Sequence, residues 1–408
     1  MREVLRTATT NNPLVEAALA RVRATAGSRR AAGSLPNPTF TYQVENAAYP
    51  GRESPADLEK ETSTFATFPL EFVYQRGPRM SRAEAEMRAA EAALDRARWS
   101  LVLDAGRAYY RLALAQLALE TTSEVRRTLG ELERYNRARA SEGVSSEGDA
   151  IRARVELDRA LMEESLDGIE LRKAQAELAP FLGLAPGGPA VPGIVLTIDP
   201  AASESIPIPS RAQILDEARM RHPDVREARA RLEVARFETS YQQSLGIRQL
   251  GLTFGNKRTA GANSLIAGFT LPVPLLDRNR GEIERAGAER EAREMELVWT
   301  ERTIAARVAA AYDSFQTLSP PGGSAGAQIL ERAEEARRIA LAAYKEGAAS
   351  LLQVLDATRA VGETRRVYYR TLIARAENLL ELRTVAAGGI TALLADQNIP
   401  EPSTEEKR

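Results

Sequence analysis

The chain has 408 residues, and its 55 basic and 56 acidic side chains nearly balance, which excludes the strongly basic surface typical of nucleic-acid-binding proteins. It has no cysteine and a single histidine, His222, so disulfides, thiol chemistry and a conventional metal site are excluded and no cofactor is expected. Hydrophobic residues make up 44 % of the chain but aromatic residues only 5 %, a composition typical of long helices packed along seams.

The sequence contains no apolar run of the roughly 18 residues that a transmembrane helix needs. Met1–Arg6 opens directly into an amphipathic helix, and no signal peptide is recognised before it. We therefore expect either a cytoplasmic chain or an export signal that lies outside this sequence.

The first predicted elements are a helix, a break and two strands. The helix runs from Glu3 to about Gly33, with Pro13 marking a start or kink, and the prolines of Leu35-Pro-Asn-Pro38 end it. Alternating β-branched and aromatic side chains predict a strand at 39–44. Residues 63–74 predict a second strand, of the length that crosses a bilayer when tilted, after a polar loop.

Two long helices follow the strands. One helix is predicted from Ser81 to about Ser141, where proline is absent, and a return helix from Gly148 to about Leu182. Apolar residues in the first helix recur at alternating steps of four and three, the spacing of a coiled-coil seam: Leu101, Ala105, Ala108, Leu112, Ala115 and Leu119. We expect the two helices to pack antiparallel as a hairpin.

The second half of the chain is predicted to repeat this order. Helices are expected at 211–246, 282–318, 329–345 and 353–383, and strands at 249–256 and 265–276 around a polar loop at Lys257–Ser264. Ser319–Gly326 (SPPGGSAG) is expected to break the helices on either side of it. A Pro- and Gly-rich linker joins the halves, with room for one short strand at Ile194–Ile198.

Three alignments indicate that the two halves are copies of one unit. Gly143 aligns with Gly347 at an offset of 204 residues, Asn12-Pro13 with His222-Pro223 at 210, and Ala108-Tyr109 with Ala311-Tyr312. Repeats of about 200 residues are whole structural halves rather than solenoid units. The predicted division is a first repeat (1–183), the linker (184–209), a second repeat (210–386) and a C-terminal tail (387–408).

The most informative repeated stretch is a helix end followed at once by a helix start, at Ala138–Leu157 and again at Leu341–Ala360. Gly143 and Gly347 are expected in the left-handed conformation that ends a helix. The expected caps of the next helices are Ser146 with Asp149, and, in a better capping box, Ser350 with Gln353. Each hairpin then turns at a tight tip, which an ordinary helical hairpin in a coiled-coil bundle would also do.

Four strands in two hairpins pose a problem for an isolated chain, because the open edges of a sheet need partners. In a membrane, several protomers would have to share one closed barrel. In water, a small four-stranded sheet capping a helical bundle would serve instead. Strand content alone leaves both arrangements open.

The duplicated order of helix, β-hairpin and long helical hairpin resembles the TolC-like outer-membrane efflux proteins of Gram-negative bacteria over nearly the whole chain. The most specific motifs are Leu35-Pro-Asn-Pro38, Asp277-Arg-Asn-Arg-Gly-Glu-Ile283 after the fourth strand, and Tyr344, Gly347, Ser350 and Val354-Leu-Asp-Ala357 around the second tip. Residues 71–79 (EFVYQRGPR) are similar to the branch that serves heavy-metal efflux pumps.

This resemblance implies a mainly α fold with a β-barrel contribution. Three protomers would share one twelve-stranded barrel in the lipid of the outer membrane, and their helices would form a hollow α-barrel across the periplasm. Such a homotrimer is the passive exit duct of a tripartite efflux or secretion system for small molecules or metal ions, and it performs no chemistry. The implied partners are an inner-membrane pump, of the RND type, and a periplasmic adaptor protein.

In this family a tyrosine and two aspartates at the second tip line or lock the periplasmic constriction. Tyr344 and Asp356 match, whereas Gln353 stands where the first aspartate is expected, and Asp149 matches the aspartate of the first tip. Ala349 replaces a basic residue often found two positions after the tip glycine. The resemblance implies a less acidic constriction with Asp356 as its charged ring, although the helix dipole alone also favours carboxylates at these N-termini.

Three other functions fit these residues less well. For an enzyme, the sequence lacks candidate catalytic groups, because the carboxylates are spread along helix faces as partners of arginine. Glu133 and Arg137 are expected as one such solvated pair. His222 occupies a repeat position rather than that of a catalytic base. A soluble coiled-coil scaffold leaves apolar strand residues such as Phe65 and Phe68 without purpose. A periplasmic adaptor carries one helical hairpin between β-rich domains, not two hairpins in a duplicated chain.

Overall fold

The computed structural model describes residues 1–10, 12–47, 59–184, 209–246, 250–318 and 325–386. The predicted linker with its short strand, most of the Ser319–Gly326 break and the C-terminal tail lie outside these residues. The elements are α1 (Arg2–Thr10), α2 (Pro13–Gly33), β1 (Thr39–Glu45), β2 (Glu61–Pro69), η1 (Glu71–Val73), α3 (Arg76–Ser141), α4 (Glu147–Leu178), η2 (Ala179–Leu182), α5 (Arg211–Arg221), α6 (Pro223–Ser244), β3 (Gly251–Thr259), β4 (Ala262–Thr270), α7 (Arg280–Thr317), α8 (Ala325–Lys345) and α9 (Leu351–Ala386).

Each half opens with two helices where the sequence predicts one. The side-chain Oδ1 of Asn12 accepts the amide of Leu14 at 2.9 Å and so caps α2, while Pro13 has no amide with which to continue α1. In the second half, His222 has an extended backbone (ψ 130°) that ends α5, and Pro223 begins α6. The prediction that Pro13 marks a helix start is confirmed, and the same physics acts at Pro223.

The strand ends differ from the prediction for local reasons. β2 stops at Pro69 rather than at residue 74, because proline cannot donate to the ladder and the 3-10 turn η1 follows. β3 and β4 are joined by Ala260 and Gly261 alone, whose φ angles of 53° and 83° are those of a type I′ turn. The loop predicted at Lys257–Ser264 is therefore wrong, since those two residues face each other in the paired strands.

The described residues form two compact units, and each unit draws on both halves of the sequence. Unit 1 contains the described residues of Met1–Glu16, Ala97–His222 and Thr303–Arg408, and unit 2 contains those of Ala17–Arg96 and Pro223–Arg302. No helix in the described ranges has the length and apolarity needed to cross a membrane.

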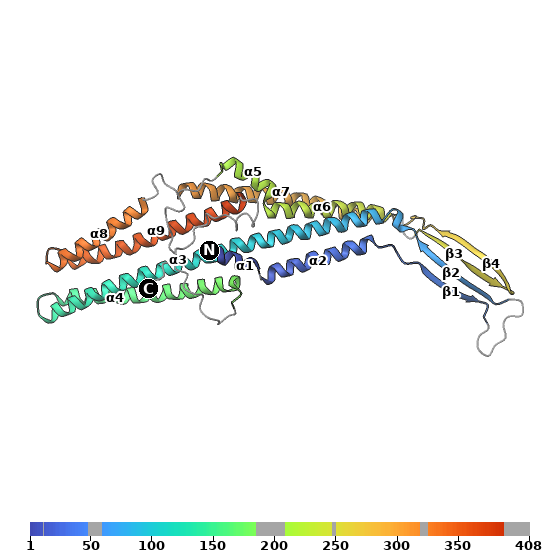
Figure 1. Ribbon diagram of the computed structural model, residues 1–408. Coiled ribbons are helices and arrows are strands. Elements are labelled where there is room, and N and C mark those ends of the chain that lie inside the picture. Colours follow the sequence, from blue (N-terminus) through green and yellow to red (C-terminus); the bar gives the residue numbers. More distant parts are fainter. Residues whose placement is uncertain (11, 48–58, 185–208, 247–249, 319–324, 387–408) are drawn as a thin grey trace. The chain divides into compact units, whose positions relative to one another are not determined.

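Unit 2 contains an antiparallel sheet in the order β1-β2-β3-β4 (Figure 1). Its central pair, β2 with β3, joins the two sequence halves, with Phe65 opposite Gly255. A Cβ atom on Gly255 would lie 2.4 Å from the Cβ of Phe65, so only glycine allows the two strands this close approach. β1 and β4 are left as the outer strands.

The register sorts the strand side chains onto two faces of opposite polarity. The apolar face carries Phe40, Tyr42, Val44, Ala66, Phe68, Leu252, Phe254, Leu265, Ala267 and Phe269, with Thr62, Thr64, Asn256, Arg258 and Asn263 among them. The polar face carries Thr39, Thr41, Gln43, Glu45, Glu61, Ser63, Thr67, Thr253, Lys257 and Ser264, with Phe65 and Ile266 among them. Most large side chains of the apolar face are exposed, Phe40 at 78 % and Leu265 at 81 %, so this face packs on no core within the described residues.

Unit 1 contains the two helical hairpins, α3 from Ala97 onward with α4, and α8 with α9 (Figure 1). The predicted seam of α3 is buried at Leu101, Ala105, Ala108 and Leu112 and half-buried at Ala115 and Leu119. Gly106 on the same helix leaves space for Leu380 of α9, whose Cδ2 would lie 2.3 Å from an added Cβ. Small residues along α3 thus let the second hairpin pack closely against the first.

Candidate gate at the hairpin tips

Both hairpins of unit 1 turn through the same backbone hydrogen bonds. At the first tip the amides of Gly143 and Val144 donate to the carbonyls of Ala140 and Arg139, at 3.0 and 2.9 Å. At the second, Gly347 and Ala348 donate to Tyr344 and Ala343, at 3.1 and 2.8 Å. This Schellman closure places a left-handed residue after the helix, and the two glycines have φ angles of 73° and 78°.

The helix that follows each tip begins at a serine. The amide of Asp149 donates to Ser146 Oγ at 3.3 Å, and that of Gln353 donates to Ser350 Oγ at 3.4 Å. At the second tip there is also a reciprocal hydrogen bond, in which the Ser350 amide donates to Gln353 Oε1 at 2.8 Å. The side chain of Gln353 is therefore engaged in closing its own turn.

Tyr344, the last aromatic residue before the second tip, joins the two hairpins. It is buried, and its hydroxyl donates to Oδ1 of Asn136 on α3. Asn136 is fully buried and donates from Nδ2 to the Leu132 carbonyl at 2.8 Å, so its carboxamide is held in place. The Tyr135 ring lies edge-on to Tyr344, with 6.0 Å between centroids. Burial raises the pKa of the Tyr344 hydroxyl further above neutrality, in keeping with its role as a neutral hydrogen-bond donor.

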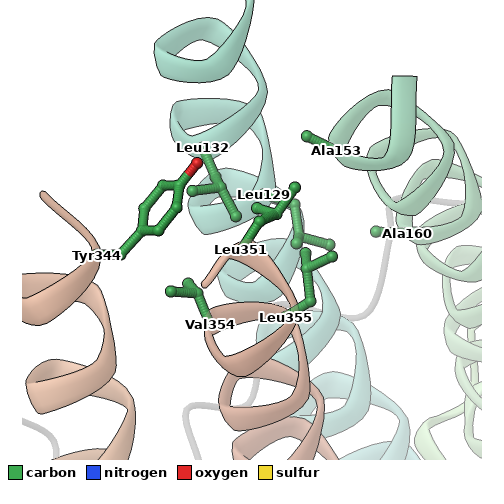
Figure 2. Close-up of a cluster of buried hydrophobic side chains, with 8 residues drawn as sticks. All are labelled: Leu129, Leu132, Ala153, Ala160, Tyr344, Leu351, Val354 and Leu355. Atoms are coloured by element: carbon green, nitrogen blue, oxygen red, sulfur yellow. The ribbon is translucent and has the colours of Figure 1, made fainter. Parts of the chain in front are cut away.

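A small apolar core lies around this hydrogen bond (Figure 2). It takes residues from all four hairpin helices: Leu129, Leu132, Ala153, Ala160, Tyr344, Leu351, Val354 and Leu355. In Figure 2 the leucine side chains of α3 and α9 point toward one another, and the Tyr344 hydroxyl points toward α3. The first turns of α9 are thereby packed against α3, so the second tip is not free to move away without exposing these side chains.

The two predicted aspartates occupy different surroundings from Tyr344. Asp149 is half-buried in the first turn of α4, and its negative charge contributes to the raised pKa of Tyr344. Asp356 is exposed on α9, with its carboxylate 3.8 Å from Arg359. The structure therefore places Tyr344 and Asn136 in the contact between hairpins, and Asp356 on the surface.

A set of ion pairs connects the same helices farther from the tips. Glu124 on α3 accepts from Arg337 of α8 at 3.1 Å and from Arg365 of α9, and Arg365 also bonds Glu334 of α8. Burial alone would raise the pKa of Glu124, but the hydrogen bonds from the two arginines outweigh it and lower that pKa. These charges clamp three helices of the two hairpins together.

Sequence reasoning missed this clamp and the Asn136 contact, because their partners lie more than 200 residues apart in the chain. One signal was present: Leu129, Leu132 and Asn136 continue the steps of three and four, and a polar residue in a coiled-coil seam often specifies a contact. The interpretation of Glu133 and Arg137 as a solvated pair is wrong. They do form an ion pair, but Glu133 is only 4 % exposed because it lies on the buried side of α3.

Across the described ranges, no cluster of three or more histidine, cysteine, aspartate or glutamate side chains is arranged to hold a metal ion. The contacts observed between the two hairpins near the tips are a hydrogen bond and apolar packing.

Known proteins share this arrangement. The sequence matches the family of outer membrane efflux proteins over residues 4–184 and 214–388. Protein CyaE of Bordetella pertussis is 32 % identical over 247 residues, which cover 56 % of this chain and 51 % of CyaE, so the chain spans about half the length of that relative. The cobalt-zinc-cadmium resistance protein CzcC of Cupriavidus metallidurans is 23 % identical over 360 residues, covering 88 % of this chain and 82 % of CzcC.

Solved structures agree with this relationship at the level of the fold. The Campylobacter jejuni CmeC outer membrane channel superposes with a TM-score of 0.78 at 15 % identity, covering 95 % of this chain and 85 % of CmeC. Because the family match extends over most of the sequence, in both halves, this chain belongs to the outer membrane efflux protein family, a family of channels and not of enzymes.

Proposed function

We propose that three copies of this chain form an outer-membrane channel, the passive exit duct of a tripartite efflux system. The observation that carries the proposal is the sheet of unit 2, which has one exposed apolar face, one polar face and two outer strands. β1 and β4 run antiparallel, so β4 of one copy can pair with β1 of the next in the pattern already present within the chain. Three copies then close twelve strands and leave no open edge.

The polarity of the two faces supports this closure. The apolar face, with Phe40, Phe254 and Phe269, suits the hydrocarbon of a membrane, and the face with Gln43, Glu45 and Lys257 suits a water-filled lumen. A sheet capping a helical bundle in water would instead turn its apolar face inward.

The helices carry a second unpartnered surface. Ile151, Val155, Met162 and Leu166 are all more than half exposed and recur along α4 at steps of four and seven. Such a stripe is the seam of a coiled coil whose partner is missing. In the proposed trimer the second hairpin of the neighbouring copy covers it, which closes the α-barrel.

We assign the gate to the tips. Tyr344 ties the second hairpin to the first, Gln353 shapes the second turn, and Asp149 and Asp356 supply carboxylates in the helices that follow the two tips. Opening would move the second hairpin away from the first when an RND-type pump and its adaptor bind. We take the repeats 1–183 and 210–386 as the units that carry one hairpin each, and the family match over 4–184 and 214–388 supports this division.

The cargo we propose is metal cations. The support is the kinship with CzcC, a cobalt-zinc-cadmium resistance protein by name, and the carboxylates Glu45 and Glu61 on the polar face of the sheet. Small organic molecules are the alternative cargo, and a comparison of cation and organic-solute flux through reconstituted channels separates the two.

The test of the architecture is the mass of the complex, with an export signal supplied upstream and the protein extracted from membranes in mild detergent. A species of three chains in the outer-membrane fraction is expected. A monomer or dimer that needs no detergent would overturn the shared barrel and favour a soluble coiled-coil scaffold.

The gate assignment has a separate test in single-channel conductance. If three copies of Asp356 form a charged ring at the constriction, Asp356→Ala should raise the resting conductance. It should also weaken the variation of that conductance with the identity of the cation in the buffer. Asp158→Ala, at an exposed carboxylate paired with Arg154 within α4, is the matched control and should leave both unchanged. A channel unaltered by Asp356→Ala would remove that residue from the gate.

A further inference from the structure

Exposed apolar side chains gather at one edge of the sheet. At this edge β2 and β4 end and β1 and β3 begin, as the opposed positions of Pro69, Gly251 and Thr270 show. The segments beyond it carry seven exposed large apolar residues, here called the rim: Leu35, Phe72, Val73, Leu271, Val273, Leu275 and Leu276. Leu276 is completely exposed. A cluster of exposed large apolar side chains at one edge indicates a surface that contacts a membrane or another protein.

The loop with most of the rim residues is held firmly in place. Pro272 and Pro274 restrict its backbone, and the Leu275 amide donates to the Val273 carbonyl at 2.8 Å. Farther on, buried Asn279 donates from Nδ2 to the Gln242 carbonyl of α6 at 2.7 Å. The loop therefore presents its leucines from a restrained backbone, and in the described part of the chain they are exposed rather than packed in a core.

The apolar face of the strands is short for a membrane. On β2 it extends from the row of Thr64 and Tyr42 to Phe68, four residues or about 13 Å along the strand. One row farther from the rim, the same face carries Val44 on β1 but Thr62, Arg258 and Asn263 on the other three strands. The apolar band of a transmembrane barrel is about 25 Å tall, and strand tilt shortens the available height further.

We propose that the rim lies in the periplasmic leaflet of the outer membrane and completes the lipid-facing band that the strands leave unfinished. The inference rests on the proposed function, since it requires the sheet to be in a membrane. The rim continues the apolar face at its helix-proximal end, where the missing height is needed. Arg278 and Arg280 follow the rim after β4, and basic residues at this level suit the phosphates of lipid headgroups.

The absence of cysteine from the sequence makes a direct test practical. Single cysteines replace Leu276, Phe40 or Leu352 and carry a nitroxide label, and the full trimer is reconstituted in vesicles of phosphatidylethanolamine and phosphatidylglycerol. Collision rates with oxygen, which enters lipid, and with a water-soluble nickel chelate are then measured. Phe40 reports the sheet face, and Leu352, which is 57 % exposed at the start of α9, is the control for water.

Leu276→Cys should match Phe40→Cys, with frequent oxygen collisions and few with nickel, while Leu352→Cys shows the reverse. If the nickel chelate reaches the label at Leu276 but not the label at Phe40, the proposal that the rim lies in lipid is overturned, and the barrel proposal stands. A label at Leu276 that is immobile and reached by neither reagent would mean that a second copy of the chain covers the rim, which also overturns the proposal. Nickel access at both Leu276 and Phe40 would mean instead that the membrane barrel itself is wrong.

Discussion

The two hairpin tips are alike in backbone and different in side chains. Gly143 and Gly347 close the same Schellman turn at an offset of 204 residues, and a serine caps the helix after each. The contact between the hairpins does not follow the repeat. At the same offset the counterpart of Tyr344 is Ala140, and that of Asn136 is Ala340.

This difference has a physical reason. A turn depends on the residues within it, so a duplicated sequence reproduces it in both places. A contact between the two hairpins needs a donor on one side and an acceptor of matching length on the other, so the two copies had to diverge there. The tips therefore separate what is needed to turn the chain from what is needed to hold the hairpins together.

The largest effect is expected at Tyr344, where the two tips differ in their side chains. Tyr344→Ala removes a buried ring and the bond to Asn136, and should lower the free energy of unfolding by about 3–5 kcal/mol. Tyr344→Phe keeps the ring and leaves the Asn136 oxygen without its donor, for a loss of about 1–3 kcal/mol. Denaturant unfolding in detergent, followed by circular dichroism, measures both. If Tyr344→Phe is as stable as the native chain, the hydroxyl does not lock the hairpins.

The clamp at Glu124 should respond to pH. Its folded-state pKa is lowered, so its contribution is present above the unfolded pKa of about 4.3 and is lost as pH falls through the folded value. Glu124→Gln should cost about 1–3 kcal/mol at pH 7, since the side chain is only 26 % exposed, and should reduce the loss of stability between pH 7 and pH 3. Glu170→Gln, which breaks an exposed ion pair with Lys173, is the control. An equal loss of stability in that variant would show that the Glu124 ion pairs contribute no more than an exposed pair.

The two tip glycines, Gly143 and Gly347, should respond equally to substitution, because they close the same turn. An added Cβ meets nothing within 4 Å at Gly143 or Gly347, so Gly→Ala at either site costs only the left-handed backbone, about 1–2 kcal/mol. Gly287→Ala is the matched control, because Gly287 lies in α7 and an added Cβ there also meets nothing within 4 Å. Alanine at this position should stabilise the protein by about 0.5–1 kcal/mol. Costs that differ between the two tips would show that their turns are not equivalent.

The smallest difference is expected between the caps. Ser146→Ala and Ser350→Ala should each cost about 0.5–2 kcal/mol. The second should cost more, because Gln353 returns a hydrogen bond to Ser350. Comparison of the two thermal midpoints tests this order, and equal shifts would mean that the reciprocal bond adds no stability.

The local elements were largely readable from the sequence. The long helices, both strand pairs and the breaks at proline follow from periodicity and from the missing amide of proline, which act within a few residues. Errors occurred where one or two residues decide a boundary: Pro69 ended β2 early, and Ala260 and Gly261 made a two-residue turn out of a predicted loop.

The sequence by itself determined the duplicated order of elements, the two tip glycines and the polarity of the strands, because each depends on neighbours along the chain. Only the tertiary structure decided that Tyr344 finds Asn136, that Glu124 is clamped by two arginines, and that Glu133 is buried. Those contacts join residues far apart in the sequence, and their geometry follows from how the helices pack. The pairing of β2 with β3 is of the same kind, and it makes one sheet of the two sequence halves.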